Sequence, residues 1–132
     1  MEQRRWRVLI ADDDPAICML IDTVLRKGPY DITACEDAES AILVIDREGP
    51  FDLIICDFML PGVSGLDLIE RVRSSESARA IPILMISGHA STVMERAKSA
   101  GADCFLNKPF TISQLRNAVA SLLSAPAHFS TS

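Results

Sequence analysis

The segment Leu53-Ile54-Ile55-Cys56-Asp57-Phe58-Met59-Leu60-Pro61-Gly62 decides the fold. Its first four residues are all apolar, which is typical of a parallel strand that helices cover on both faces. The run ends at a carboxylate, and Pro61-Gly62 then marks a turn. We therefore interpret residues 53–56 as a buried strand whose carboxyl end presents Asp57.

Four further short apolar runs precede and follow this one, and helical patterns separate them. The predicted strands are residues 8–11, 32–35, 53–56, 83–86 and 104–106. Apolar residues between them recur at the spacing of one helix face, as in Ile17, Leu20, Ile21, Val24 and Leu25. The helix-start signals are Asp14-Pro15, Asp37, Ser91 and the capping pattern Thr111–Gln114. This alternation predicts an α/β protein with a parallel five-stranded sheet and right-handed crossovers.

Length and composition restrict the class of protein. The chain has 132 residues, of which 48% are hydrophobic and 23% charged, and its net charge is −5. These values suit one compact domain, and the acidic balance argues against direct nucleic-acid binding. No apolar run reaches the roughly 18 residues that span a bilayer, and the four cysteines form no zinc or disulfide pattern. We expect a reduced, cytoplasmic protein with no membrane partner.

Polar side chains follow four of the predicted strands. They are Asp12, Asp13 and Asp14 after the first strand, Asp57 after the third, Ser87 at the end of the fourth, and Lys108 after the fifth. Ligands of open α/β sheets bind beyond these carboxyl ends. Two carboxylates ~4 Å apart repel by about 4 kcal/mol at an effective dielectric near 20, so a cation is favoured among them. Hard oxygen ligands favour Mg²⁺, and a carboxylate beside this ion and an ammonium can attack phosphorus, giving an acyl phosphate on Asp57.

Four segments together resemble the receiver domain of bacterial two-component response regulators, and the resemblance runs from about Arg7 to Leu123. The segments are Val8 to Pro15, Leu53 to Gly65, Ile86 to His89, and Lys108 to Phe110. The resemblance implies a flavodoxin-like, doubly wound (βα)5 fold with strand order 2-1-3-4-5 and helices on both faces. Residues 1–6 would then be an N-terminal extension and residues 7–123 the receiver domain. Residues 124–132 would be a flexible tail or a truncated linker.

The resemblance also implies how phosphate and metal are bound. Asp57 would accept a phosphoryl group from a sensor histidine kinase or a phosphotransfer protein. Asp13, Asp57 and the backbone carbonyl of Met59 would bind Mg²⁺ directly, and Asp12 would act through water. Lys108 would contact the phosphoryl oxygens.

A switch from the phosphorylation site to a partner surface is implied as well. Ser87 would move toward the phosphoryl group and Phe105 would turn inward, while the Lys108-Pro109 bond would be cis. The face of the fourth helix, fifth strand and fifth helix would then bind an unknown downstream protein target, with a homodimer as an alternative outcome. Phe105 stands where a tyrosine is often found, so no hydroxyl reports its rotation. Met59 and His89 would flank the phosphoryl group and could set water access.

Other classes of function remain to be weighed. A Mg²⁺-dependent aspartyl-phosphate phosphatase would need a second Asp two residues after its nucleophile, and Met59 cannot transfer a proton there. A pseudo-receiver that is never phosphorylated would be expected to lose an acid or the lysine, and none is missing. Nucleotide binding lacks both the GxGxxG motif and a P-loop. We predict a phosphoacceptor switch rather than an enzyme, acting through a partner or as a fragment of a larger regulator or hybrid kinase.

Overall fold

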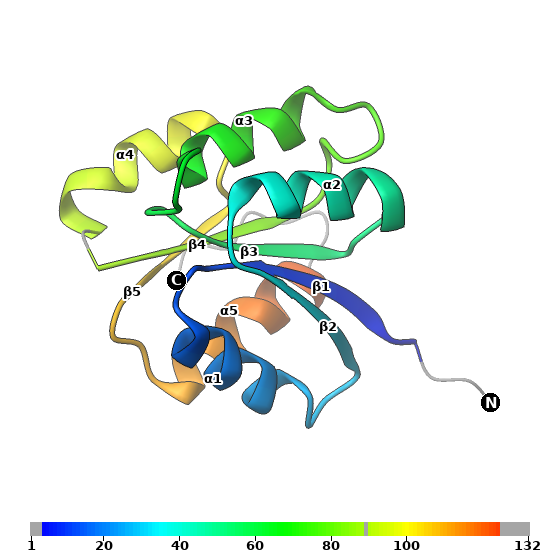
Figure 1. The fold of residues 1–132 in the computed structure, drawn as a ribbon. Coiled ribbons are helices and arrows are strands. Elements are labelled where there is room, and N and C mark those ends of the chain that lie inside the picture. Colours follow the sequence, from blue (N-terminus) through cyan, green and yellow to red (C-terminus); the bar gives the residue numbers. More distant parts are fainter. Residues whose placement is uncertain (1–3, 89, 125–132) are drawn as a thin grey trace.

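In the computed structural model, which describes residues 4–88 and 90–124, strands and helices alternate along the chain (Figure 1). The strands are β1 (Trp6–Ala11), β2 (Tyr30–Cys35), β3 (Leu53–Asp57), β4 (Ile83–Ser87) and β5 (Cys104–Asn107). The helices are α1 (Pro15–Leu25), α2 (Ala38–Glu48), α3 (Gly65–Ser74), α4 (Ala90–Ala100) and α5 (Ile112–Ser124). The predicted alternation is confirmed. Strands β1 and β2 begin two residues earlier than predicted, because Trp6 and Tyr30 extend their parallel pairing.

The five strands form one parallel sheet in the order β2-β1-β3-β4-β5, which confirms the expected fold. The chain winds from β1 to β2 on one side and then returns to β3 on the other side of β1. This reversal is the place where open α/β sheets bind ligands. In register, Ala11 lies beside Cys56, and Ser87 lies beside Asn107, so the carboxyl ends of the strands share one edge.

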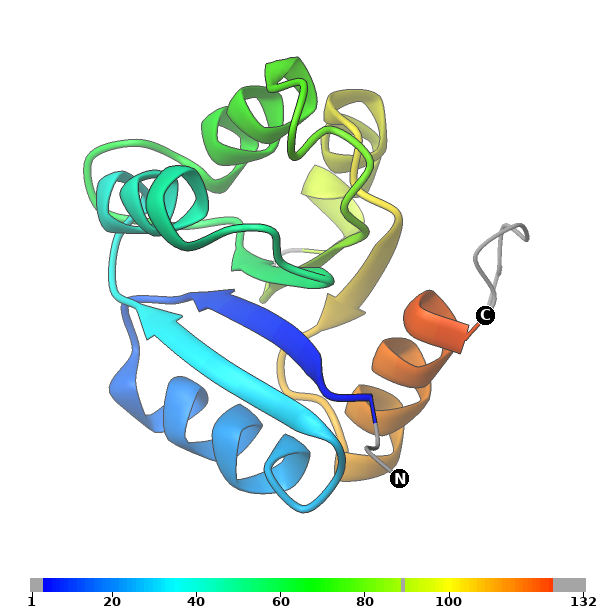
Figure 2. The same cartoon turned by 90° about the vertical axis from the view of Figure 1, so that its right-hand side faces the viewer.

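Helices cover both faces of the sheet (Figures 1 and 2). Helices α1 and α5 lie on one face, and α2, α3 and α4 lie on the other. The central strand contributes to both cores: Leu53 and Ile55 pack toward α1 and α5, while Ile54 and Cys56 pack toward the other three helices. This double burial is the reason that β3 is apolar without alternation.

Side-chain caps begin three helices as the sequence predicts. The Asp14 carboxylate accepts from the Ala16 amide at 2.9 Å, at the start of α1. Asp37 caps α2 by accepting from the Ser40 amide at 2.7 Å. The capping box at α5 is confirmed in both directions: the Gln114 amide donates to the hydroxyl of Thr111, and the Thr111 amide donates to the side chain of Gln114.

Two helix starts differ from the prediction. Helix α4 begins at Ala90, so Ser91 lies inside its first turn and is not the residue before it. A serine is common at both positions, and sequence alone does not separate them. At α3 the structure adds a capping box that was not predicted, formed by Ser64 and Asp67.

The described part of the chain has no membrane-spanning helix and no disulfide bond. Within residues 4–88 and 90–124, no helix is both long enough and apolar enough to cross a membrane. All four cysteines are free thiols. The stability of the described fold therefore comes from the two cores and their caps, without a covalent cross-link.

Candidate functional site

Three carboxylates gather at the carboxyl edge of the sheet, where β1 and β3 end side by side. Asp12 and Asp13 follow β1, and Asp57 is the last residue of β3. One oxygen from each carboxylate lies within 4.8 Å of the others. Asp12 is 1% exposed and Asp57 is 6% exposed, whereas Asp13 faces solvent. The structure therefore brings Asp12, Asp13 and Asp57 together: two carboxylates are nearly buried, and that of Asp13 is exposed to solvent.

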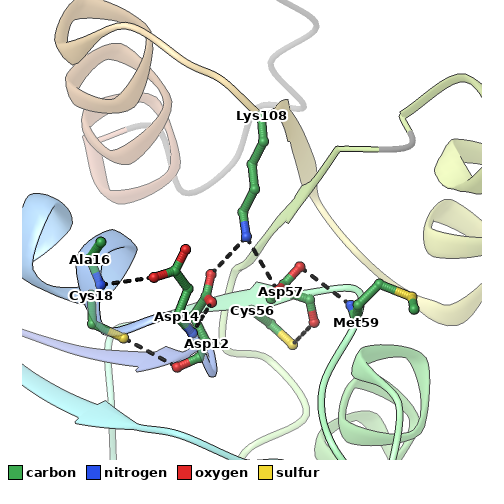
Figure 3. Close-up of polar contacts among 8 residues, drawn as sticks. All are labelled: Asp12, Asp14, Ala16, Cys18, Cys56, Asp57, Met59 and Lys108. Atoms are coloured by element: carbon green, nitrogen blue, oxygen red, sulfur yellow. Dashed lines mark hydrogen bonds and ion pairs between the residues drawn. The ribbon is translucent and has the colours of Figure 1, made fainter.

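Lys108 reaches into this cluster from the end of β5. Its ammonium nitrogen lies 3.1 Å from Oδ2 of Asp12 and 3.3 Å from Oδ2 of Asp57, and Figure 3 shows it between the two. Burial alone would lower the pKa of Lys108, but hydrogen bonds and charges from both carboxylates raise it overall. The lysine is therefore a charged ammonium at neutral pH. Its peptide bond to Pro109 is cis, as the resemblance implied.

Asp57 is held in an unfavourable environment for a carboxylate. Burial raises its pKa first and the negative charge of Asp12 raises it further, while Lys108 and the Met59 amide act in the opposite direction without cancelling the shift. The Met59 amide donates to Oδ1 of Asp57 at 3.3 Å, and Lys108 donates to Oδ2. Each oxygen of Asp57 thus has one donor, and the carboxylate is fixed in direction.

The donor set fits a small divalent cation such as Mg²⁺. Opposite oxygen ligands of octahedral Mg²⁺ are about 4.2 Å apart, so oxygens within 4.8 Å need only a small contraction to share one ion. When the three acids are ionised, the single ammonium of Lys108 leaves an excess of two negative charges at the cluster. A divalent cation would neutralise that excess.

Met59 occupies the loop directly after β3, close to Asp57. Its side chain is 60% exposed and extends away from the carboxylate of Asp57 (Figure 3). The hydrogen bond from the Met59 amide is its observed interaction with Asp57. A backbone carbonyl ligand at Met59 remains a prediction.

The predicted switch residues lie on neighbouring strands, with Ser87 at the carboxyl edge and Phe105 beside Met85, two residues further into the sheet. Ser87 ends β4 and is 1% exposed, and its backbone carbonyl accepts from the Lys108 amide at 2.9 Å. Phe105, in β5, is partly buried against the core that α2, α3 and α4 cover. His89 lies outside the described residues. The structure thus brings Ser87 next to the lysine loop and seats Phe105 under the helices.

One residue that supports the site was not singled out from the sequence. Gly65 begins α3 so close to β3 that a Cβ atom there would lie 2.2 Å from the backbone oxygen of Asp57. The Gly65 amide also donates to the backbone oxygen of Phe58 at 2.9 Å. The signal available in the sequence was a glycine between the cap Ser64 and the apolar Leu66. At Gly65 the backbone of α3 packs directly against the backbone of Asp57.

Cys18, on α1, is a second such residue. Its thiol donates to the backbone oxygen of Asp12 at 3.3 Å. Burial, followed by the negative charges of Asp12 and Asp14, raises the pKa of Cys18 to about 11. Cys18 is therefore a neutral thiol that helps to fix the Asp12 backbone.

The fold and this edge define a class of protein: a doubly wound α/β domain with an acidic edge and a lysine beside its buried aspartate. The sequence model of the response regulator receiver domain matches residues 8–120, and the chain belongs to this family. It is therefore a receiver domain of the two-component response regulators.

Individual relatives agree with that assignment. The chain is 36% identical over 124 residues to the transcriptional regulatory protein TrcR of Mycobacterium tuberculosis, covering 92% of this chain and 47% of the relative. It is 30% identical over 115 residues to the chemotaxis protein CheY-3 of Vibrio cholerae, covering 86% and 88%. The receiver domain of the sensor histidine kinase PA1611 from Pseudomonas aeruginosa, described with magnesium in its active site cleft, superposes with a TM-score of 0.84 at 26% identity, covering 91% and 98%. The chain spans about half the length of the first curated relatives.

Proposed function

We propose that this receiver domain accepts a phosphoryl group on Asp57 from the phosphohistidine of a sensor histidine kinase or phosphotransfer protein. The observation that carries the proposal is the arrangement of Asp57: nearly buried, grouped with Asp12 and Asp13, and 3.3 Å from the ammonium of Lys108. A structural carboxylate gains nothing from two acidic neighbours. A nucleophile that acts on a phosphorylated donor beside a cation does.

The transfer step is an in-line displacement at phosphorus. A carboxylate oxygen of Asp57 forms the new bond, and the bond from phosphorus to the donor's histidine nitrogen breaks, with a proton taken up by the imidazole. The Met59 amide orients the carboxylate of Asp57 through a hydrogen bond. Lys108, which also donates to this carboxylate, would bind the phosphoryl oxygens during the transfer. The product is an acyl phosphate, and we class the domain as a phosphoacceptor switch that assists its own phosphorylation and dephosphorylation.

Mg²⁺ is the cofactor that the donor set favours. Asp13, Asp57 and the backbone carbonyl of Met59 would hold it directly, and Asp12 would do so through water. When bound, it neutralises the acidic cluster and the phosphoryl oxygens. The magnesium described for the PA1611 receiver domain supports this assignment.

Phosphorylation would change the partner surface. The acyl phosphate would carry about −1.5 to −2 charges in place of the single charge of the Asp57 carboxylate, at the carboxyl edge beside Lys108 and Ser87. We propose that Ser87 and Phe105 transmit this change to the face formed by α4, β5 and α5, where a downstream protein target binds in the cytoplasm. Homodimerisation on phosphorylation is the alternative output.

Acetyl phosphate and Mg²⁺ supply a direct test. Intact-mass measurement should find one phosphoryl group per chain, none after Asp57→Asn, and unchanged labelling in the matched control Asp52→Asn. Lys108→Ala should retain some labelling. Full labelling of the Asp57→Asn chain would place the acceptor elsewhere, and labelling that persists in EDTA would refute the role of the metal.

A further inference from the structure

The seam between α3 and α4 is open along its middle. These helices lie next to each other on one face of the sheet (Figures 1 and 2). They enclose a groove of about 400 Å³, lined by Leu66, Glu70, Glu95, Arg96, Ser99 and Ala100. Leu66 and Glu70 are four residues apart and share a face of α3. The small side chains of Ser99 and Ala100 on the α4 wall leave the space between the helices unfilled.

Two carboxylates in the groove have no cationic partner. Glu70 and Glu95 are exposed, and neither forms an ion pair within the part of the chain that the structure describes. Arg96 lines the same groove, but its guanidinium lies over the ring of Phe58, 5.7 Å from the centroid. Leu66 and Ala100 add apolar surface. Two unpaired carboxylates beside apolar surface are complementary to a segment that carries Lys or Arg next to an apolar residue.

Arg73 ties the two helices together at one end of the groove. From the last turn of α3, its Nε and Nη2 donate to the backbone oxygen of Gly101 at 3.1 and 2.8 Å, just after α4. Its Nη1 donates to the backbone oxygens of Arg79 and Ile81 at 2.7 Å each. The carboxyl end of α4 is therefore anchored to α3.

Both walls of the groove contact residues at the carboxyl end of β3, namely Asp57 and the following Phe58. Helix α3 begins at Gly65, which packs directly on the backbone oxygen of Asp57. Helix α4 contacts the next residue, because Arg96 lies over the Phe58 ring. A displacement of Asp57 and Phe58 would therefore alter the contacts of both α3 and α4.

We propose that the α3–α4 groove is a docking site for a cationic segment of a partner protein, and that phosphorylation of Asp57 changes its affinity. The segment carries an Arg or Lys that pairs with Glu70 and Glu95, and an apolar side chain that contacts Leu66. Only the dependence on phosphorylation rests on the function proposed above. The groove is distinct from the face of α4, β5 and α5 that the family resemblance indicates.

The test uses the dipeptide acetyl-Leu-Arg-amide as the probe and acetyl-Leu-citrulline-amide as its uncharged counterpart. In ¹H–¹⁵N spectra of the full chain, the arginine peptide should shift amides that line the groove, and the citrulline peptide should bind more weakly. The double variant Glu70→Gln/Glu95→Gln should lower affinity for the arginine peptide roughly fivefold. The matched control Glu76→Gln, an exposed acid on the loop after α3, should bind like wild type.

Two results would overturn the docking site: shifts centred on Asp12, Asp13 and Asp57 instead of the groove, or equal affinity in the double variant and wild type. Repeating the titration with acetyl phosphate and Mg²⁺ should change affinity by roughly fivefold or more. Equal affinity in a chain shown by mass to be phosphorylated would refute the coupling. A chain that takes up no phosphoryl group would contradict the proposed function instead, and the titration of the unmodified chain would still decide the docking site.

Discussion

The two edges of the sheet carry acids and cations in opposite arrangements. At the amino edge three acids each have a partner of their own: Asp31 with Arg5, Asp52 with Arg4, and Asp103 with Arg73, at 2.7–3.0 Å. Two of these acids also accept backbone amides, from Arg7 and Ile83. At the carboxyl edge three acids gather around one ammonium, and Lys108 pairs with only two of them, Asp12 and Asp57.

This difference separates charges that support the fold from charges that leave room for a ligand. The acids of the amino edge are satisfied within the chain, so neutralising one removes a contact. The carboxyl edge has an excess of negative charge, and Asp12 and Asp57 are the acids most removed from water. Under the function proposed above, the cost of that excess would be recovered when a cation binds.

The largest expected effect comes from breaking the amino edge at Arg73. Arg73→Ala should lower the free energy of unfolding by about 2–4 kcal/mol, because three backbone carbonyls and Asp103 lose their donor. Urea unfolding measures this. The matched control is Arg71→Ala, whose exposed contact with Asp46 at 3.5 Å should be worth less than about 1 kcal/mol. If the two variants lowered the free energy of unfolding equally, the contacts of Arg73 at the amino edge would not have the stabilising role proposed for them.

The fold was predictable because its signals are local. Each strand is a short apolar run, and the helices have one-sided apolar stripes, three of them with a predicted cap such as Asp37. The candidate site was also predictable, since parallel strands place their carboxyl ends at one edge and the acids follow those ends directly. Strand starts were less well predicted, because Trp6 and Tyr30 extend their strands through pairing with each other, which no local pattern indicates.

The supporting contacts could not be predicted in the same way. Arg73 binds the backbone of Gly101 and the side chain of Asp103, 28 and 30 residues away. Nothing in a sequence marks which arginine will reach a distant carbonyl. The open seam near Glu70 likewise depends on how two helices pack, and not on the composition of either one.

A smaller effect is expected where α3 touches the acceptor at the carboxyl edge. Gly65→Ala should cost about 2 kcal/mol, because the added Cβ would lie 2.2 Å from the backbone oxygen of Asp57 and the backbone must shift. Labelling by acetyl phosphate should slow as well. Gly88→Ala is the control for stability, since a Cβ there meets no atom within 4 Å. Unchanged stability and labelling in Gly65→Ala would show that the contact does not position Asp57.

The smallest expected effect sharpens the comparison most, because the same substitution should have opposite signs at the two edges. In metal-free buffer, Asp57→Asn should raise the free energy of unfolding by about 1 kcal/mol, since it removes a desolvated charge beside Asp12. Asp52→Asn should lower it by about the same amount, because Asp52 accepts from Arg4 and from the Arg7 amide.

The pH dependence of stability is an independent check on the sign of the effect of Asp57→Asn. Because burial and Asp12 raise the pKa of Asp57 in the folded chain, the folded state binds its proton more tightly than the unfolded state. Wild type therefore loses stability relative to Asp57→Asn as the pH rises from 3.8, the ordinary value, through the folded pKa. The advantage of Asp57→Asn should be absent in more acidic buffer and constant at neutral pH. If the stability advantage of Asp57→Asn stays the same across that range, the charge of Asp57 is not what destabilises the folded chain.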